Sequence, residues 1–292
     1  MTVQELQKLF LPKLAPEDFF ILLAEATRKE KTFLLAHPEY ELDAAPAALA
    51  EEFFARRLKH EPVASIVGHK AFYGCDFLVT PDTLIPRPET ELIVEHILES
   101  IPAKQERPLD ILDIGTGSGC IAISLAATLA ERQPGSLAAI RFFATDISEA
   151  ALAIARKNAE RHSVGDTITF LAGDLLAPYL SSLEKNRAII IAANLPYLSR
   201  DIYDNAPEDV RGFEPESALV SGEQGLDHYY RLLRNVRDVL HPAHTVTLFL
   251  EISPEQDAEL ERYAMSLFPD ALLTIHADLA GKKRLAEIRL RA

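Results

Sequence analysis

A glycine-rich stretch of the sequence is suited to ligand binding, and it follows an apolar run and precedes a helical pattern. Glycine lets backbone N–H groups at a helix N-terminus approach a bound group, so the stretch predicts a cradle of the kind that binds nucleotides. The dinucleotide fingerprint needs its third glycine where this sequence has Cys120, so NAD is disfavoured. The stretch consists of Gly115, Thr116, Gly117, Ser118 and Gly119.

Carboxylates stand before and after this stretch, each at the end of a predicted strand or shortly after it. Asp113 precedes the glycines and suits a ligand with a cationic end, while Asp146 can accept hydrogen bonds from both hydroxyls of a ribose. Asp174 is placed to accept from the exocyclic amine of adenine, with Leu175 packed on the ring. Taken alone, Asp146 also fits a helix cap and Asp174 a turn. Because the carboxyl ends of parallel strands meet at one sheet edge, the set predicts a site for S-adenosylmethionine.

The tetrapeptide Asn194-Leu195-Pro196-Tyr197 ends the uncharged run 188–193. Pro196 holds Leu195 in extended conformations, so by itself the match also fits a stiff turn. After a fourth strand, however, it would lie where the methyl group of the cofactor points. The side-chain oxygen of Asn194 and the carbonyl of Leu195 can then accept both hydrogens of a planar amide or arylamine, and Tyr197 can stack on that group. Such orientation is worth roughly 7–11 kcal/mol and needs no acid or base catalyst.

These residues need a parallel sheet behind them, and the pattern from Leu109 onward supplies one. β-rich and helical segments alternate there, which predicts a mostly parallel sheet covered by helices. The long segment Ser199–Gly222 is predicted to pack over the sheet edge and to help form the substrate site. Strands are expected at 109–113, 140–145, 167–171, 187–193, 244–251, 271–277 and 284–290, and helices near 118–131, 148–162, 224–240 and 254–267.

The chain divides into three parts. Residues 1–62 carry apolar stripes at helical spacing, punctuated by prolines, and predict a small helical domain that serves either substrate recognition or structure. Residues 63–84 are β-rich and predict a hairpin linker, and residues 85–292 form the domain with the sheet. Arg87 lies between two prolines at the start of that domain, and is either aimed into the site or part of a rigid connector.

Composition limits the classes of function. The 292 residues are 48% hydrophobic and 25% charged, as in ordinary globular proteins with a sizeable core. The net charge of −14 opposes attraction to nucleic acid and to anionic lipid, so neither is expected as a direct partner. The two cysteines and the lack of a secretory signal predict the reducing cytoplasm, and no apolar run is long enough to span a membrane. No metal site is predicted.

Together, Gly115–Gly119 and Asn194–Tyr197 resemble the class I amino-group methyltransferases, which have a Rossmann-like α/β fold with a seven-stranded, mostly parallel sheet. Other segments narrow the resemblance to the HemK/PrmC family of release factor protein-(glutamine-N5) methyltransferases, in which a small N-terminal helical domain precedes the methyltransferase domain. The resemblance covers essentially the whole chain. The segments that narrow it are 68–74, 84–91, 209–219 and 278–284.

The resemblance implies methylation of the glutamine in the Gly-Gly-Gln motif of class I peptide chain release factors, by a cytoplasmic monomer that uses S-adenosylmethionine. It places cofactor contacts at Gly115–Gly119, Asp146, Leu175 and Asn194, and glutamine contacts at Asn194–Tyr197. We expect Asp174 to join the cofactor contacts and Arg87 the substrate contacts. The family usually has Asn-Pro-Pro-Tyr, and Leu195 replaces the first proline here, but leucine supplies the same backbone carbonyl. Leu175 stands where some members carry an aromatic residue.

Three other functions fit parts of the pattern. Adenine-N6 methylation of RNA or DNA uses the same loop chemistry, and the acidic net charge argues against it. Glutamine methylation of a large-subunit ribosomal protein shares the fold but is less similar at residues 86–90. A cofactor-binding scaffold without catalysis is disfavoured by the intact Asn194 and Tyr197.

Overall fold

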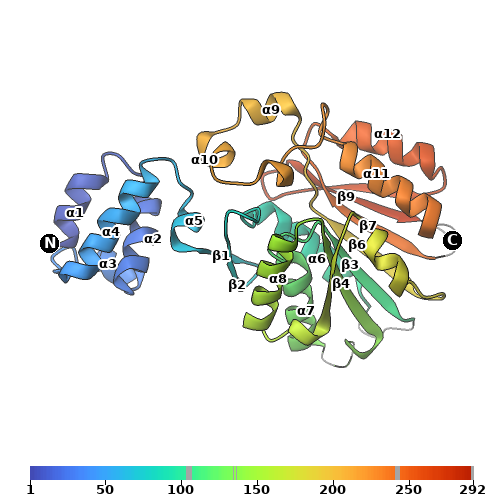
Figure 1. The fold of residues 1–292 in the computed structure, drawn as a ribbon, viewed down its shortest axis with the longest axis horizontal. Helices are drawn as coiled ribbons and strands as arrows, with labels where there is room; N and C mark the ends of the chain where they lie inside the picture. Colours follow the sequence, from blue (N-terminus) through green and yellow to red (C-terminus); the bar gives the residue numbers. More distant parts are fainter. Residues whose placement is uncertain (103–106, 134, 136, 241–243, 291–292) are drawn as a thin grey trace. The chain divides into compact units, whose positions relative to one another are not determined.

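The protein forms two compact units, which are described separately (Figure 1). The computed structural model describes residues 1–292 except 103–106, 134, 136, 241–243 and 291–292. The first unit contains Met1–His69 and Ala206–Glu214, and the second contains Lys70–Asn205 and Pro215–Ala292. The first unit thus extends beyond the predicted domain 1–62 and takes in part of the loop at Ser199–Gly222. The last two residues of the predicted domain 85–292 lie outside the described residues.

The first unit is helical, as predicted, and is held by an aromatic core. Phe19 stacks on Phe54 with ring centroids 4.8 Å apart, and Phe10 packs against the same ring at 4.7 Å. Thr2 and Glu5 form a capping box that pairs N–H groups at the start of α1. The helices of this unit are α1 (Val3–Phe10), α2 (Pro16–Thr27), α3 (Lys31–Ala36), α4 (Ala44–Arg57), α5 (Val63–Val67) and α10 (Glu208–Arg211).

The prediction of β structure at residues 63–67 is wrong, because these residues form α5. Pro62 stands at the N-cap of this helix, and Gly68 ends it in the left-handed conformation with φ of 80°. Ile66 is buried in the helical core, so tertiary packing here outweighs the preference of β-branched residues for strands. The two-stranded sheet comes later, with β1 (His69–Phe72) and β2 (Cys75–Leu78).

The second unit is built on a seven-stranded sheet, as far as the chain is described, with the strand order β5-β4-β3-β6-β7-β9-β8. The first five strands in this order are parallel, while β9 is antiparallel to both β7 and β8. Every predicted strand has its counterpart, so the predicted mostly parallel sheet is confirmed. The strands are β3 (Leu109–Ile114), β4 (Ile140–Asp146), β5 (Ile168–Ala172), β6 (Ala188–Ala193), β7 (Val246–Glu251), β8 (Leu272–Ala277) and β9 (Lys283–Leu290).

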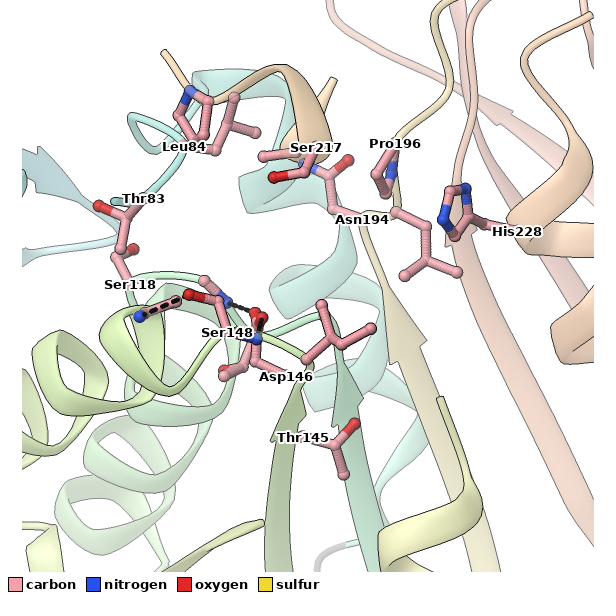
Figure 2. Close-up of a pocket in the computed structure, with 18 of the residues that line it drawn as sticks. Thr83, Leu84, Ser118, Thr145, Asp146, Ser148, Asn194, Pro196, Ser217 and His228 are labelled. Atoms are coloured by element: carbon pink, nitrogen blue, oxygen red, sulfur yellow. Dashed lines mark hydrogen bonds between the residues drawn. The ribbon is translucent and has the colours of Figure 1, made fainter. Parts of the chain in front are cut away.

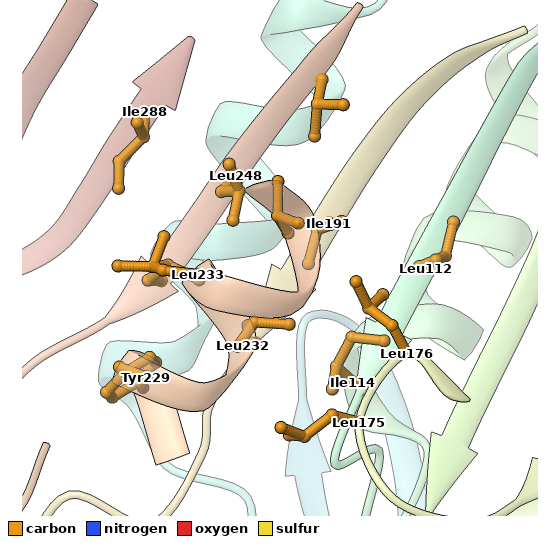
Figure 3. Close-up of a cluster of buried hydrophobic side chains, with 14 of the residues drawn as sticks. Leu112, Ile114, Leu175, Leu176, Ile191, Tyr229, Leu232, Leu233, Leu248 and Ile288 are labelled. Atoms are coloured by element: carbon orange, nitrogen blue, oxygen red, sulfur yellow. The ribbon is translucent and has the colours of Figure 1, made fainter. Parts of the chain in front are cut away.

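Helices cover both faces of this sheet, and residue alternation divides the core between them (Figure 1). Ile111 packs with α6 (Glu91–Ser100) and α7 (Cys120–Arg132) on one face, whereas its neighbour Leu112 packs with α11 (Asp227–Asn235) on the other. Figure 3 shows Ile191 and Leu248 of the sheet with Leu232 and Leu233 of α11, in the cluster that also contains Leu112. No described helix has the length and apolar character needed to cross a membrane. The helices are α6 (Glu91–Ser100), α7 (Cys120–Arg132), α8 (Glu149–Arg161), α9 (Arg200–Asp204), α11 (Asp227–Asn235) and α12 (Asp257–Leu267).

Candidate active site

A cavity of about 380 Å³ opens at the carboxyl edge of the parallel strands (Figure 2). Its volume lies within the range of roughly 300–1,000 Å³ that is typical of small-molecule sites. All predicted site residues lie in the described part of the chain, and all except Asp113, Gly119 and Tyr197 line this cavity. The predicted residues that line it are Arg87, Gly115, Thr116, Gly117, Ser118, Asp146, Asp174, Leu175, Asn194, Leu195 and Pro196, and the long loop adds Pro215, Ser217 and Ala218.

The glycine loop is shaped by positive φ angles and held by hydrogen bonds within the protein. Gly115, Gly117 and Gly119 have φ of 72°, 55° and 85°, values that glycine adopts without steric cost. The N–H groups of Gly115 and Thr116 both donate to the Thr145 carbonyl at 2.9 Å. These N–H groups therefore do not face a ligand, which differs from the predicted cradle.

Asp113 lies under the loop and is 1% exposed. Its Oδ2 accepts from the Thr116 hydroxyl at 2.6 Å and from the Ala122 N–H at 3.1 Å. Burial raises the pKa of this carboxyl to about 6 in spite of these hydrogen bonds, and the charge of Asp146 adds to the rise. Its Oδ1 is buried and has no hydrogen-bond partner among the described residues. Asp113 thus fixes the loop and keeps one unpaired acceptor.

Asp146, the last residue of β4, holds two backbone N–H groups. Its Oδ2 accepts from Gly117 at 2.9 Å and its Oδ1 from Ser148 at 2.8 Å, and Ser148 in turn caps α8 (Figure 2). The carboxylate therefore lines the cavity and supports a helix start, and its contact with a ribose stays a prediction. Ile147 also lines the cavity although 76% of it is exposed. Sequence reasoning missed Ile147, and its apolar side chain beside an edge carboxylate was the available signal.

Asp174 forms an ion pair with Arg231 of α11, and each side chain is about half exposed. Its carboxylate is therefore shared with a guanidinium group rather than left entirely to an adenine amine. Leu175 is buried, has φ of 49°, and its carbonyl accepts from the Thr145 hydroxyl at 3.1 Å. Arg231 lines the cavity but has no motif around it in the sequence.

Asn194 is tied to the protein at one end of its amide. Its Nδ2 donates to the Thr90 hydroxyl at 3.0 Å, whereas its Oδ1 is buried with no partner within the described residues. The Leu195 N–H donates to the Tyr229 hydroxyl at 3.2 Å, and this hydroxyl donates to the carbonyl of Glu251. The segment is thus anchored on both sides, and one buried acceptor remains for a ligand. A buried acceptor without a partner lowers the stability of the protein as long as no ligand is bound.

Tyr197 is held by its backbone rather than placed in the cavity lining. Its carbonyl accepts from Gln256 Nε2 at 2.8 Å, and the same nitrogen donates to the Gly225 carbonyl at 3.2 Å. Burial raises the pKa of the Tyr197 phenol, and the positive charge of Arg87 opposes this rise. The stacking of Tyr197 on a flat substrate group stays a prediction.

His228 of α11 is a cavity residue that sequence reasoning did not find (Figure 2). Its Nδ1 lies 2.6 Å from the Ser221 hydroxyl oxygen, which also accepts from the His228 backbone N–H at 3.0 Å. If the serine donates its one hydrogen to Nδ1, the neutral ring carries its proton on Nε2. Burial lowers the pKa of His228, and Arg231 lowers it further, so the ring is neutral near neutral pH.

The residues at this edge fit S-adenosylmethionine. Asp146 can accept from a ribose, and the apolar side chains of Ile147 and Leu175 can pack on an adenine ring. The unpaired Oδ1 of Asn194 can accept a hydrogen bond, which the sulfonium centre of the cofactor cannot donate but a substrate N–H can. The cavity therefore suits a methyl donor next to an acceptor that carries N–H groups.

Family profiles match both units of the chain. The PrmC N-terminal domain matches residues 11–68, and a methyltransferase domain matches residues 111–211. The first match covers helices α2 to α5 of the first unit, and the second covers most of β3, the glycine loop and Asn194 to Tyr197. The profiles thus agree with the division of the chain into a helical part and a part with the sheet.

Curated relatives match over most of their own length. A release factor glutamine methyltransferase of Nitratidesulfovibrio vulgaris is 37% identical over 278 residues, which cover 94% of this chain and 86% of the relative. Proteins with the same name from Koribacter versatilis and Bacillus subtilis are 40% and 38% identical, over 79% and 76% of this chain and 76% and 73% of the relatives.

Solved structures share the fold. The crystal structure of the hMettl16 catalytic domain in complex with the MAT2A 3′UTR hairpin 6 superposes with a TM-score of 0.56 at 19% identity. The match covers 75% of this chain and 77% of that one. At this identity the similarity shows a common methyltransferase fold, and the predicted Rossmann-like fold class is confirmed.

Proposed function

This chain belongs to the family of release factor glutamine methyltransferases, and we propose that its cavity prepares a glutamine side chain for methylation at N5. The substrate is the glutamine of the Gly-Gly-Gln motif in class I peptide chain release factors, and the methyl donor is S-adenosylmethionine. One observation carries the proposal. Asn194 has its Nδ2 paired with Thr90 and its Oδ1 buried without a partner in the described part of the chain.

The reaction needs orientation more than acid or base catalysis. A primary amide nitrogen is a weak nucleophile, because its lone pair is delocalised into the carbonyl group. It carries two N–H donors, and we assign one to Asn194 Oδ1 and the other to the backbone carbonyl of Leu195. Holding both directs the nitrogen toward the methyl donor, an effect of roughly 7–11 kcal/mol. As the N–C bond forms, the bond between the methyl group and the sulfur of the donor would break with its electron pair going to sulfur, and the amide nitrogen then gives up one proton to solvent.

The bound S-adenosylmethionine supplies an electrophilic methyl group. Asp146 would hold its ribose, while Ile147 and Leu175 would enclose its adenine, with Asp174 at the exocyclic amine. The glycine loop, fixed by Asp113 and Thr145, lets the cofactor lie close to the backbone. The protein thereby restricts where the methyl group can lie relative to Asn194.

The remaining substrate contacts belong to the same proposal. Pro196 restricts the conformation of the backbone next to the Leu195 carbonyl. Tyr197 stacks on the planar amide and excludes water, and Arg87, which lines the cavity, contacts the substrate. The first unit recognises the release factor outside the methylated loop.

We further propose that the chain acts as a monomer in the cytoplasm and needs no direct contact with nucleic acid or membrane. The net charge of −14 supports the exclusion of phosphate-rich partners. Cys75 and Cys120 are both free thiols, which is compatible with a reducing compartment.

The test is mass spectrometry of a purified class I release factor after incubation with this protein and S-adenosylmethionine. We expect one added methyl group on the peptide that contains Gly-Gly-Gln, located on the glutamine. A release factor with that glutamine replaced by alanine is the substrate control and should gain none. If the release factor stayed unmodified while RNA or DNA acquired methyl groups on adenine, the adenine-N6 alternative would replace the proposal.

A further inference from the structure

Glu251, the last residue of β7, brings a buried carboxylate next to the anchor of Asn194. Glu251 is 2% exposed, and the hydroxyl of Thr90, which is 1% exposed, lies within hydrogen-bonding reach of its carboxylate and acts to lower the pKa of that carboxyl. The same hydroxyl oxygen accepts from Asn194 Nδ2 at 3.0 Å. The three side chains therefore lie in one buried line, along which a hydrogen bond from Thr90 to Glu251 can continue the bond from Asn194 to Thr90. The other carboxylate oxygen, Oε2, is buried and unpaired as far as the described residues show.

The number of hydrogens that the threonine hydroxyl and the carboxylate carry fixes the direction of these hydrogen bonds. A threonine hydroxyl has a single hydrogen, and an ionised carboxylate can only accept. When Thr90 gives its hydrogen to Glu251, its oxygen is left as an acceptor toward Asn194. The asparagine must then present its NH2 group to Thr90, so its Oδ1 is the end available to a substrate N–H.

A proton on Glu251 removes this constraint. A protonated carboxyl group can donate to the Thr90 oxygen, and the threonine hydrogen is then free to point at Asn194. The asparagine amide can now rotate so that its oxygen faces Thr90 and its NH2 group faces the substrate. An NH2 group opposite a substrate N–H is a donor facing a donor, and the acceptor that orients the nucleophile is lost.

We propose that Glu251 is a positioning residue, which acts through Thr90 to hold the Asn194 amide with its oxygen available to the substrate nitrogen. The inference rests on the proposed function, since it concerns the residue that orients the glutamine amide. It adds Glu251 to the residues on which the reaction depends, although this buried acid touches neither substrate nor cofactor.

The surroundings of Glu251 place its titration near neutral pH. Burial raises the pKa of this carboxyl to about 7, the hydrogen bond from Thr90 and the charges of Arg284 and Arg87 oppose the rise, and Glu89 adds to it. Below about pH 7 the carboxyl group is protonated, so the oriented form of Asn194 is lost as the pH falls. The other titratable groups that interact with it are Tyr197, Tyr229 and Cys120, and burial raises the pKa of each.

The experiment measures kcat for release factor methylation from pH 5.5 to pH 9, with cofactor and release factor both saturating. The wild type should lose activity below about pH 7 with the slope of a single proton. Glu251→Gln cannot ionise, so its kcat should be several-fold lower and its acidic limb should disappear. Thr90→Val keeps the shape of threonine and removes the relay, so kcat should fall about tenfold or more. Thr90→Ser restores the hydroxyl and should recover most of the rate.

Glu287→Gln is the matched control. Glu287 lies on β9, is 6% exposed, and pairs with His276 and Arg289 rather than with Thr90. Its replacement also removes a buried strand carboxylate, and the acidic limb should remain. Thermal unfolding and the affinity of each variant for S-adenosylmethionine show whether fold and cofactor site are intact.

A second readout needs neither substrate nor cofactor. In protein labelled with 15N at asparagine side chains, the Asn194 NH2 resonances, assigned by their loss in Asn194→Ala, should shift between about pH 6 and pH 8. They should not shift over this range in Glu251→Gln or in Thr90→Val. Persistence of both the resonance shift and the acidic limb of kcat in Glu251→Gln would overturn the inference, because Asp113 or His228 would then be responsible. Failure of the wild type to methylate any release factor would instead overturn the proposed function.

Discussion

The side chain of Leu195 occupies the space that a Cβ atom on Gly115 would need. A Cβ built on Gly115 would lie 2.8 Å from Leu195 Cδ2, closer than real Cβ atoms approach a neighbour. The residue that departs from the Asn-Pro-Pro-Tyr pattern therefore packs directly on the glycine loop. Leu195 is 4% exposed and belongs to the core on the α11 face of the sheet. The glycine loop and the tetrapeptide at 194–197 are therefore in close contact.

Gly115→Ala should lower both stability and cofactor affinity. The variant meets Leu195 and also places alanine at φ of 72°, a combination that we expect to cost about 1–3 kcal/mol in the free energy of unfolding. Urea unfolding and calorimetry with S-adenosylmethionine measure the two effects. Gly74→Ala is the control for φ alone, because Gly74 has φ of 76° and a Cβ atom added there would meet no atom of the described chain within 4 Å. Equal losses in the two variants would show that the contact with Leu195 is unimportant.

The sheet could be predicted from the sequence because its strands carry their signal locally. Ala188–Ala193 is uncharged and buried on both faces, and the polar residues that follow each strand mark the edge where the cavity lies. Helix α5 could not be predicted in this way. Three of its five residues, Val63, Ile66 and Val67, are β-branched and prefer strands, and the packing of all three in the helical core accounts for the helix.

The hydrogen-bond partners of the site residues could not be predicted from the sequence. Asn194 depends on Thr90, and the Leu195 N–H depends on Tyr229, so each contact joins segments that are far apart in the chain. Burial of a carboxylate such as Glu251 depends on the whole fold. Motifs therefore revealed which residues meet at the edge, and the structure was needed to show which atoms remain unpaired.

Asn194→Ala should abolish methyl transfer while cofactor affinity stays within a few-fold of the wild type. The substitution removes the acceptor that orients the substrate nitrogen and leaves Asp146 and the glycine loop in place. Methylation of purified release factor and calorimetry with S-adenosylmethionine separate the two effects. Asn205→Ala is the control, since Asn205 also belongs to the second unit and its Nδ2 makes a local hydrogen bond, to the Asp201 carbonyl at 2.9 Å. Near-normal turnover by the Asn194 variant would rule out the orienting role.

Asp146→Ala should weaken cofactor binding about tenfold or more. The carboxylate would accept from the ribose, and it also holds the Gly117 and Ser148 N–H groups, so its loss removes a contact and loosens the loop. Asp174→Ala is the comparison variant, with a smaller expected loss because Asp174 is half exposed and already paired with Arg231. Calorimetry decides, and an unchanged affinity in Asp146→Ala would refute the ribose assignment.

Asp113 should make the stability of the cofactor-free protein depend on pH. Its pKa in the folded state is about 6, above the ordinary 3.8, so the folded protein holds this proton more tightly than the unfolded chain does. The stabilising effect of protonation is present below about pH 4 and is lost as the pH rises through about 6. The full change is up to about 3 kcal/mol.

Asp113→Asn tests this directly, because its amide oxygen can still accept from Thr116 and Ala122 but the side chain does not titrate. As the pH rises from 4 to 8, the wild type should lose stability relative to this variant, measured as the difference between their free energies of unfolding in urea. Asp166→Asn, at an exposed position before β5, is the control and should not change the pH profile. A difference that stays constant between pH 4 and pH 8 would mean that Asp113 is ionised throughout, with its buried charge compensated by the two hydrogen bonds.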